Sequence, residues 1–218
     1  MNAENEIYLD HIAASPVRPA AVETMTRLLC DGFGNPQSVH ERGQLAADVL
    51  LEARSRVAAL VGADPQGVIF TATGSEANNL AVRGIARGRL KRSNRIIVSA
   101  VEHVSVSEPA RILGKEGFEL VVLPVDGHGL VSPDDLAREL GKGAALVSIL
   151  HASTEIGTIE PIADLAALCR DAGVPMHTDA WGTAGAIETD IAALGVDAMT
   201  VAAQNFGGPP GAAALVVG

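Results

Sequence analysis

The sequence predicts an α/β fold in which helices cover both faces of a mostly parallel sheet. β-rich runs alternate with helical runs from residue 68 onward, which implies crossover connections between parallel strands. The expected strands are nearly continuous apolar runs, as in strands that are buried on both faces. The chain is 48 % apolar but only 3 % aromatic, so the core must consist mainly of Ala, Val, Leu and Ile.

Before the first strand, two helices are expected at residues 17–31 and 43–61. In the first, Val22, Met25 and Leu28 recur at helical spacing, and the second shows the same pattern. Residues 1–16 are interpreted as an N-terminal arm, and 17–218 as one large domain of a size that a single core can support.

The rest of the chain alternates strand and helix. Ser132 is a suitable N-cap for a helix that continues with Pro133, and Gly173 is a suitable helix stop. The expected strands are 68–72, 95–100, 119–125, 145–150, 174–179, 197–203 and 213–217, and the expected helices are 75–90, 104–115, 132–140 and 162–173.

Charge and composition exclude several functional classes. The net charge of −10 disfavours nonspecific binding to nucleic acid or to anionic membranes. The sequence has no apolar run long enough to cross a membrane and no signal-peptide pattern at its start. Cys30 and Cys169 form neither a disulfide framework nor a metal signature, and both are expected in the core. A cytoplasmic location is therefore expected.

Polar residues follow five of the expected strands. Ligands of such sheets collect beyond the carboxyl ends of the strands, so these residues should share one rim. The expected rim residues are Thr73, Gly74, Ser75, Glu76, Glu102, His103, His151, Ser153, Thr154, Glu155, Asp179, Trp181, Gln204 and Asn205.

Several of these residues allow both a binding role and a structural one. Residues 73–75 open a helix, where free N–H groups and a hydroxyl could bind phosphate, although Ser75 before Glu76 is also an ordinary helix start. His103 could stack on a ring or transfer a proton, or it could simply bond to a neighbour. Asp179 could bind a cation or cap the next turn. Structural roles are expected for His151 and His177.

Seven stretches in order give the chain a resemblance to the class V aminotransferase fold, and within it to the cysteine desulfurases of the NifS and IscS type. The resemblance implies the large domain of a type I transferase that depends on pyridoxal 5′-phosphate (PLP). The stretches are YLDHIAASPV (8–17), GNPQSVHERG (34–43), FTATGSEANNLA (70–81), Glu102-His103, HASTEIGTIEPI (151–162), HTDA (177–180) and GGPPGAAALVV (207–217).

The resemblance also implies roles at the rim. Asp179 matches the residue that pairs with the ring nitrogen of PLP, and His103 matches the residue that stacks on the ring. Ser75 matches a hydroxyl that contacts the phosphate, and Thr154 stands where the family usually has an Asn. The implied cofactor-binding set is Thr73, Gly74, Ser75, Glu76, His103, Thr154, Asp179 and Gln204.

The departures from the family pattern lie close together. Asn205 stands where the family has the lysine that forms a Schiff base with PLP, and Gln204 and Ala202 replace a His and a Ser that contact the phosphate. Gly182 replaces a Gln, and Trp181 adds bulk beside it. An amide cannot replace the nucleophilic amine of lysine.

No other lysine is placed to substitute. Lys91, Lys115 and Lys142 each precede an expected strand, which puts them about 17–20 Å from the rim, the length of a strand. No catalytic residue and no metal are therefore expected. Any PLP should bind without a covalent bond, and a site without PLP is the stronger expectation.

Three interpretations of function remain open. The first is a noncatalytic desulfurase homologue that acts as a subunit or scaffold, linked to sulfur or iron–sulfur metabolism, with Trp181 filling the cofactor space. The second is a PLP enzyme that a partner chain completes. The third is a binding domain for another small ligand. The family's C-terminal domain is not in this sequence, so an exposed apolar patch and an oligomer or protein partner are expected.

Overall fold

The computed structural model describes residues 7–218 and contains one seven-stranded sheet, in the order β1-β7-β6-β5-β4-β2-β3. Strands β3, β2, β4, β5 and β6 pair in parallel, whereas β7 runs antiparallel to both β6 and β1. The predicted mostly parallel sheet is thus confirmed. The strands are β1 (Val68–Thr71), β2 (Arg95–Ser99), β3 (Glu119–Leu123), β4 (Leu146–Ser148), β5 (Met176–Asp179), β6 (Ala198–Ala202) and β7 (Ala213–Val217).

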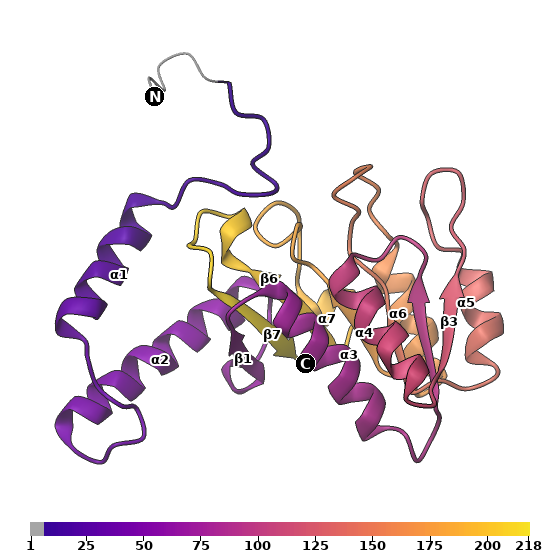
Figure 1. Ribbon diagram of the computed structural model, residues 1–218, viewed down its shortest axis with the longest axis horizontal. Coiled ribbons are helices and arrows are strands. Elements are labelled where there is room, and N and C mark those ends of the chain that lie inside the picture. Colours follow the sequence, from indigo (N-terminus) through magenta and orange to yellow (C-terminus); the bar gives the residue numbers. More distant parts are fainter. Residues whose placement is uncertain (1–6) are drawn as a thin grey trace.

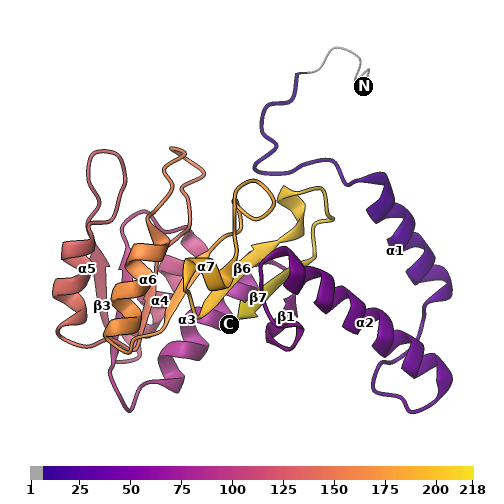
Figure 2. The same ribbon diagram turned by 180° about the vertical axis from the view of Figure 1, so that it is seen from behind.

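Helices cover both faces of the sheet, as Figures 1 and 2 show from opposite sides. Alternate residues of β2 face the two layers: Ile96 and Val98 pack with α3 and α4, and Ile97 packs in the larger cluster with α5 and α6. The helices are α1 (Pro19–Asp31), α2 (Glu41–Leu60), α3 (Gly74–Gly88), α4 (Val104–Lys115), α5 (Pro133–Leu140), α6 (Ile162–Asp171) and α7 (Ile191–Leu194), with 3₁₀ turns η2 (Pro65–Gly67) and η3 (Ala203–Asn205).

Local sequence signals explain several helix ends. The Ser132 hydroxyl accepts a hydrogen bond from the Asp135 amide at the start of α5, as its position predicts. Gly173 follows α6 with a φ of 65°, a conformation that favours glycine. The sequence did not predict α7, η2 or η3, because a single turn is too short to show a period.

The helices α1 and α2 project from the sheet (Figure 1), and we call this pair the arm, as distinct from the N-terminal segment before it. None of the residues of α1 is buried, and α2 buries only Gly43 and Ala58. Cys30 lies on α1 and is exposed, so the prediction that it packs in the core is wrong, whereas Cys169 on α6 is buried. Residues 7–16 form no helix or strand, and residues 1–6 of the predicted N-terminal arm lie outside the described residues.

The three lysines lie where the sequence predicted them. Lys91, Lys115 and Lys142 come just before β2, β3 and β4, at the edge of the sheet opposite the rim. At that edge Lys142 pairs with Glu139, which also pairs with the buried Arg95. Among residues 7–218, no helix combines the length and apolar character that crossing a membrane requires.

Candidate functional site

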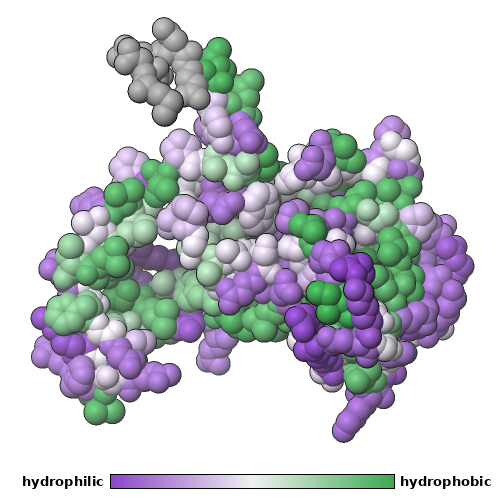
Figure 3. Space-filling model, in the orientation of Figure 1, coloured by the Kyte–Doolittle hydropathy of each residue, from purple (hydrophilic) through white to green (hydrophobic). Residues whose placement is uncertain are grey.

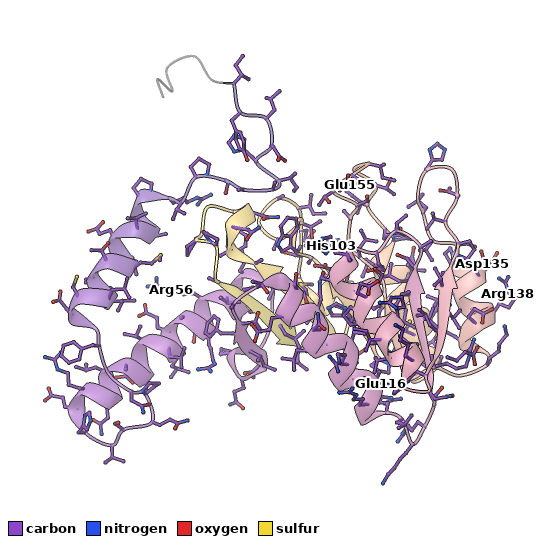
Figure 4. All side chains as sticks on the ribbon, in the orientation of Figure 1. Arg56, His103, Glu116, Asp135, Arg138 and Glu155 are labelled. Carbon is purple, nitrogen blue, oxygen red and sulfur yellow. The ribbon has the colours of Figure 1, made fainter. Side chains whose placement is uncertain are left out.

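A cavity of about 260 Å³ lies at the carboxyl ends of the parallel strands, where the sequence placed the rim. It receives side chains from the start of α3, the start of α4 and the loops that follow β4, β5 and β6. The labelled His103 marks its position in Figure 4. Its lining residues are Thr73, Gly74, Ser75, Asn78, His103, Ser105, Leu150, Ala152, Thr154, Asp179, Trp181, Gly182 and Gln204.

The predicted cofactor-binding residues thus meet at one cavity, with one exception, whereas Glu102, His151, Ser153, Glu155 and Asn205 of the predicted rim do not line it. Glu76 does not line it. The Glu76 carboxylate turns back and accepts a hydrogen bond of 2.8 Å from the Ala72 amide, and the Glu76 amide donates to the Thr73 hydroxyl at 3.0 Å. This reciprocal pairing resembles a capping box, so Glu76 stabilises the start of α3 and does not reach a ligand.

The first turn of α3 forms one wall of the cavity. Its N-cap, Thr73, satisfies one of the N–H groups that a helix leaves free at its start. Gly74 and Ser75 follow, and both line the cavity. The helix dipole and the remaining N–H groups favour an anion at this end of the cavity.

A chain of hydrogen bonds crosses the floor of the cavity. Asn78 donates from Nδ2 to Asp179 Oδ2 at 2.6 Å and to the Ser105 hydroxyl at 2.8 Å. Ser105 in turn lies 2.7 Å from His103 Nδ1. These contacts fix the orientations of the Asp179 carboxylate and of the imidazole. The network therefore preorganises two of the residues to which the sequence assigned a binding role.

No Lys or Arg lines the cavity around this network. Asp179 is 8 % exposed, and burial raises the pKa of its carboxyl, while bonds from Trp181 and Asn78 and the nearby charge of His103 oppose the rise. Asn78 is 1 % exposed, and its Oδ1 has no hydrogen-bond partner. A ligand that carries a protonated nitrogen would compensate for both burials, because an unpaired buried acceptor is costly.

A second carboxyl lies behind the cavity wall. Glu102 Oε1 accepts hydrogen bonds from the Ser99 hydroxyl at 2.6 Å and from the Leu150 amide at 2.8 Å, whereas Oε2 is buried without a partner. Burial raises the pKa of Glu102 to about 8, and the nearby charge of Asp179 adds to the rise. Glu102 thus holds the loop after β4 in place and carries a proton at neutral pH.

The other strand-end histidines are structural, as the sequence indicated. His177 is fully buried and contacts the hydroxyls of Ser148 at 2.8 Å and Thr200 at 3.0 Å, and its burial lowers its pKa to about 3. His151 contacts the Thr183 hydroxyl at 3.0 Å. Neither histidine lines the cavity.

The turn after β6 carries Gln204 and Asn205, which the resemblance aligns with a His and the Schiff-base lysine of the family pattern. Asn205 donates from Nδ2 to the main-chain oxygen of Trp181 at 3.0 Å. Gln204 donates from Nε2 to the Ala13 oxygen at 3.3 Å, and its own main-chain oxygen accepts from Ser15 at 2.7 Å. Both amides are therefore engaged with main chain. No lysine lines the cavity.

The cavity remains open despite the bulk of Trp181. The indole packs against Gly74, where a Cβ atom would lie only 2.7 Å from Trp181 Cδ1. A Cβ on Gly182 would lie 2.7 Å from the Thr154 methyl group, so a Gln at this position would require Thr154 to move. The expectation that Trp181 fills the cofactor space is wrong. In the part of the chain that the structure describes, no group of three metal-ligating side chains occurs.

Comparison with known proteins agrees with this architecture. The model of the aminotransferase class-V family matches residues 7–218, so the chain belongs to that family. The cysteine desulfurase IscS of Dictyoglomus turgidum is 42 % identical over 214 residues, which are 98 % of this chain and 54 % of that protein.

Two solved structures are equally similar in fold. A NifS-like protein superimposes with a TM-score of 0.92 at 31 % identity, covering 97 % of this chain and 58 % of its own. The structure named "SspA in complex with cysteine" gives the same TM-score and identity, covering 97 % and 61 %. This chain spans about half the length of the relatives that it matches.

The residues present fit part of a PLP site. The buried Asp179 and the unpaired Asn78 oxygen suit a protonated ring nitrogen, and the start of α3 suits a phosphate. The covalent attachment point does not fit, because Asn205 has no nucleophilic amine. The site can therefore accommodate the group but cannot bond to it covalently through the residue at this position.

Sequence reasoning missed Asn78 and Ser105. Asn78 comes one turn after Gly74 on α3, and residues four apart share a helix face, so this spacing could have placed it at the cavity. Ser105 follows the predicted His103 by two residues and carries no comparable signal.

Proposed function

We propose that this chain is a lysine-less cysteine desulfurase homologue that binds PLP without a covalent bond and does not carry out desulfuration by itself. The observation that carries the proposal is Asn205, at the position of the family's lysine and bonded to the Trp181 main chain. The cavity beside it is open and retains the polar network of Asp179 and His103.

The chain's own residues define how the ligand would be held. Asp179 and Asn78 would accept from a protonated ring nitrogen, His103 would cover the ring, and the first turn of α3 would bind the phosphate. When bound, PLP supplies an electron-withdrawing ring that stabilises negative charge on an attached carbon. Without an amine at residue 205, the chain has no group at that position to attach the cofactor or to shuttle the proton.

A role as a subunit is supported by the arm of α1 and α2. Apolar side chains of these helices and of the loop between them are unusually exposed: Leu29 by 78 %, Phe33 by 63 % and Leu51 by 58 %. Figure 3 shows hydrophobic residues along this part of the molecule. Contiguous apolar surface of this kind marks a site of protein association. We therefore infer an oligomer or a complex with a protein partner.

The cellular setting follows from the resemblance. We infer a cytoplasmic protein that acts with the enzymes of sulfur or iron–sulfur metabolism, because its relatives include cysteine desulfurases. Two further possibilities share the same cavity. A partner chain could supply the missing amine, or the cavity could bind a different ligand with a cationic nitrogen, which the unpaired Asn78 oxygen favours.

Equilibrium dialysis of PLP against the purified protein, followed by mass spectrometry, tests the proposal. We expect one PLP per chain in native mass spectra and none after denaturation. A mass addition that survives borohydride reduction and denaturation would contradict the noncovalent mode. No bound PLP in native spectra, with a different small molecule retained through purification, would favour the alternative ligand.

A further inference from the structure

Both main-chain polar groups of Trp181 form hydrogen bonds with side chains. Its amide donates to Asp179 Oδ1 at 2.9 Å, and its carbonyl oxygen accepts from Asn205 Nδ2 at 3.0 Å. Asp179, at the ring-nitrogen position, and Asn205, at the lysine position, thus both bond to the turn at Trp181, and we call this pair of bonds the clamp. This clamp fixes the direction in which the indole leaves the main chain.

The indole lies against the first residue of α3. A Cβ atom on Gly74 would lie 2.7 Å from Trp181 Cδ1 and 3.5 Å from Nε1, so the absence of a side chain at Gly74 makes room for this edge of the ring. Trp181 lines the cavity together with Thr73 and Ser75. Within residues 7–218, the indole N–H makes no hydrogen bond, although the residue is partly buried.

Two independent features indicate that a ligand occupies this space. The start of α3, a helix of 15 residues, presents free N–H groups to the cavity. Asn78, 1 % exposed, lines the same cavity, and its buried Oδ1 has no hydrogen-bond partner among residues 7–218. The helix start suits an anionic group, and the amide oxygen suits a donor, so the ligand should carry both.

The anionic end has lost two donors relative to the family pattern. Ala202 has no hydroxyl, and the Gln204 amide donates to the Ala13 oxygen instead. No Lys or Arg lines the cavity. The indole N–H is therefore a free donor at the end of the cavity that most needs one.

We propose that the Trp181 indole N–H binds the phosphate group of a phosphomonoester at the start of α3, and that Asn205 is the positioning residue that holds the indole there. Where the phosphomonoester is PLP, this proposal rests on the proposed function and adds a phosphate-binding residue to it. Indole is a donor only, so the contact is insensitive to pH and accepts either ionisation state of phosphate.

The first experiment uses the fact that Trp181 is the only tryptophan, so its emission reports this site alone. Inorganic phosphate should change the emission of the unmodified protein. Calorimetric titrations then compare PLP with pyridoxal, which lacks the phosphate. For Trp181→Phe, we expect PLP affinity to fall about tenfold, the scale of one hydrogen bond to a charged group, with pyridoxal affinity unchanged.

The second experiment tests the clamp. Asn205→Ala should shift the Trp181 emission to longer wavelength and weaken PLP binding about as much as Trp181→Phe does. Asn94→Ala is the matched control, because Asn94 is exposed and bonds the Gly117 oxygen at the opposite edge of the sheet. It should leave emission and affinity unchanged. Thermal unfolding of each variant verifies that it is folded.

The outcomes separate the two proposals. Equal losses of PLP and pyridoxal affinity in Trp181→Phe would mean that the indole only packs, which overturns the inference and leaves the proposed function intact. Phosphate binding that depends on Trp181, without PLP binding, would support the phosphate site and refute the PLP role. Failure of PLP and of phosphate to bind the unmodified protein would overturn both.

Discussion

Asn205 Nδ2 and the Trp181 carbonyl oxygen lie 3.0 Å apart, in a hydrogen bond that joins the turn after β6 to the turn after β5. The residue at the family's lysine position therefore has a structural contact of its own. Asn205 does not itself line the cavity, but this bond joins it to Trp181, which does.

Asn205→Lys should restore covalent attachment of PLP. We expect a mass addition after borohydride reduction and denaturation, because the amine becomes a nucleophile beside the retained Asp179 and His103. Asn94→Lys places a lysine at the opposite edge and should show no addition. If Asn205→Lys binds PLP in native spectra but never covalently, the cavity does not orient the cofactor as proposed.

Asp179→Asn should weaken PLP binding by tenfold or more, because it removes the negative charge that faces the ring nitrogen. The same change should raise the melting temperature of the ligand-free protein at alkaline pH. Burial raises the pKa of Asp179, so its ionised form destabilises the folded state. Calorimetry measures the PLP affinity and thermal unfolding measures the melting temperature. A decrease in both would contradict the role assigned to Asp179.

Stability should fall as the pH rises from about 4.5 to about 8. Burial raises the pKa of Glu102 from its ordinary 4.5 to about 8 in the folded protein. Between those values the folded state keeps a proton that the unfolded state has released, so stability is lost as the pH rises through the folded pKa. Glu102→Gln should reduce this pH dependence. At pH values above ~8, its melting temperature should be higher than that of the unmodified protein.

Glu108→Gln is the control for that measurement. Glu108 is exposed and pairs with Arg111, which lowers its pKa, so it should not titrate in this window. If the stability of Glu102→Gln depends on pH in the same way as that of the unmodified protein, another group causes the pH dependence.

Leu29→Glu should reduce the size of the assembly measured by light scattering. Leu29 is 78 % exposed on α1, and a charge there opposes burial in an interface. Leu90→Glu is the matched control, because Leu90 is 52 % exposed just beyond the end of α3, away from the arm. A monomer for the unmodified protein at micromolar concentration would contradict association through the arm in the isolated chain.

Much of the fold follows from local patterns in the sequence. The run from Arg95 to Ser99 is apolar on both faces, and it forms a central strand covered by helices on each side. The reversal of β7 was not predicted, because an apolar run such as Ala213–Val217 reads the same in either direction. The exposure of Cys30 was missed because helical spacing shows that a face is apolar but not what covers it.

The candidate site was predictable where a residue lies at a strand end. Asp179 and His103 meet at the cavity because carboxyl ends of parallel strands share an edge. Asn78 was not found, although its position one turn after Gly74 could have placed it at the cavity; only the folded structure shows that its Oδ1 is unpaired. The contact between Trp181 and Gly74 joins residues about a hundred positions apart, and no local pattern encodes it.

The contacts between the N-terminal segment and the turn after β6 have a practical consequence. Ser15 and Ala13 bond to Gln204, and the Arg18 amide donates to the Gly207 oxygen at 2.9 Å. Residues near the start of the chain are thereby attached to the turn that carries Asn205. A deletion that removes residues 13–18 would therefore remove contacts of Gln204, which lines the ligand pocket.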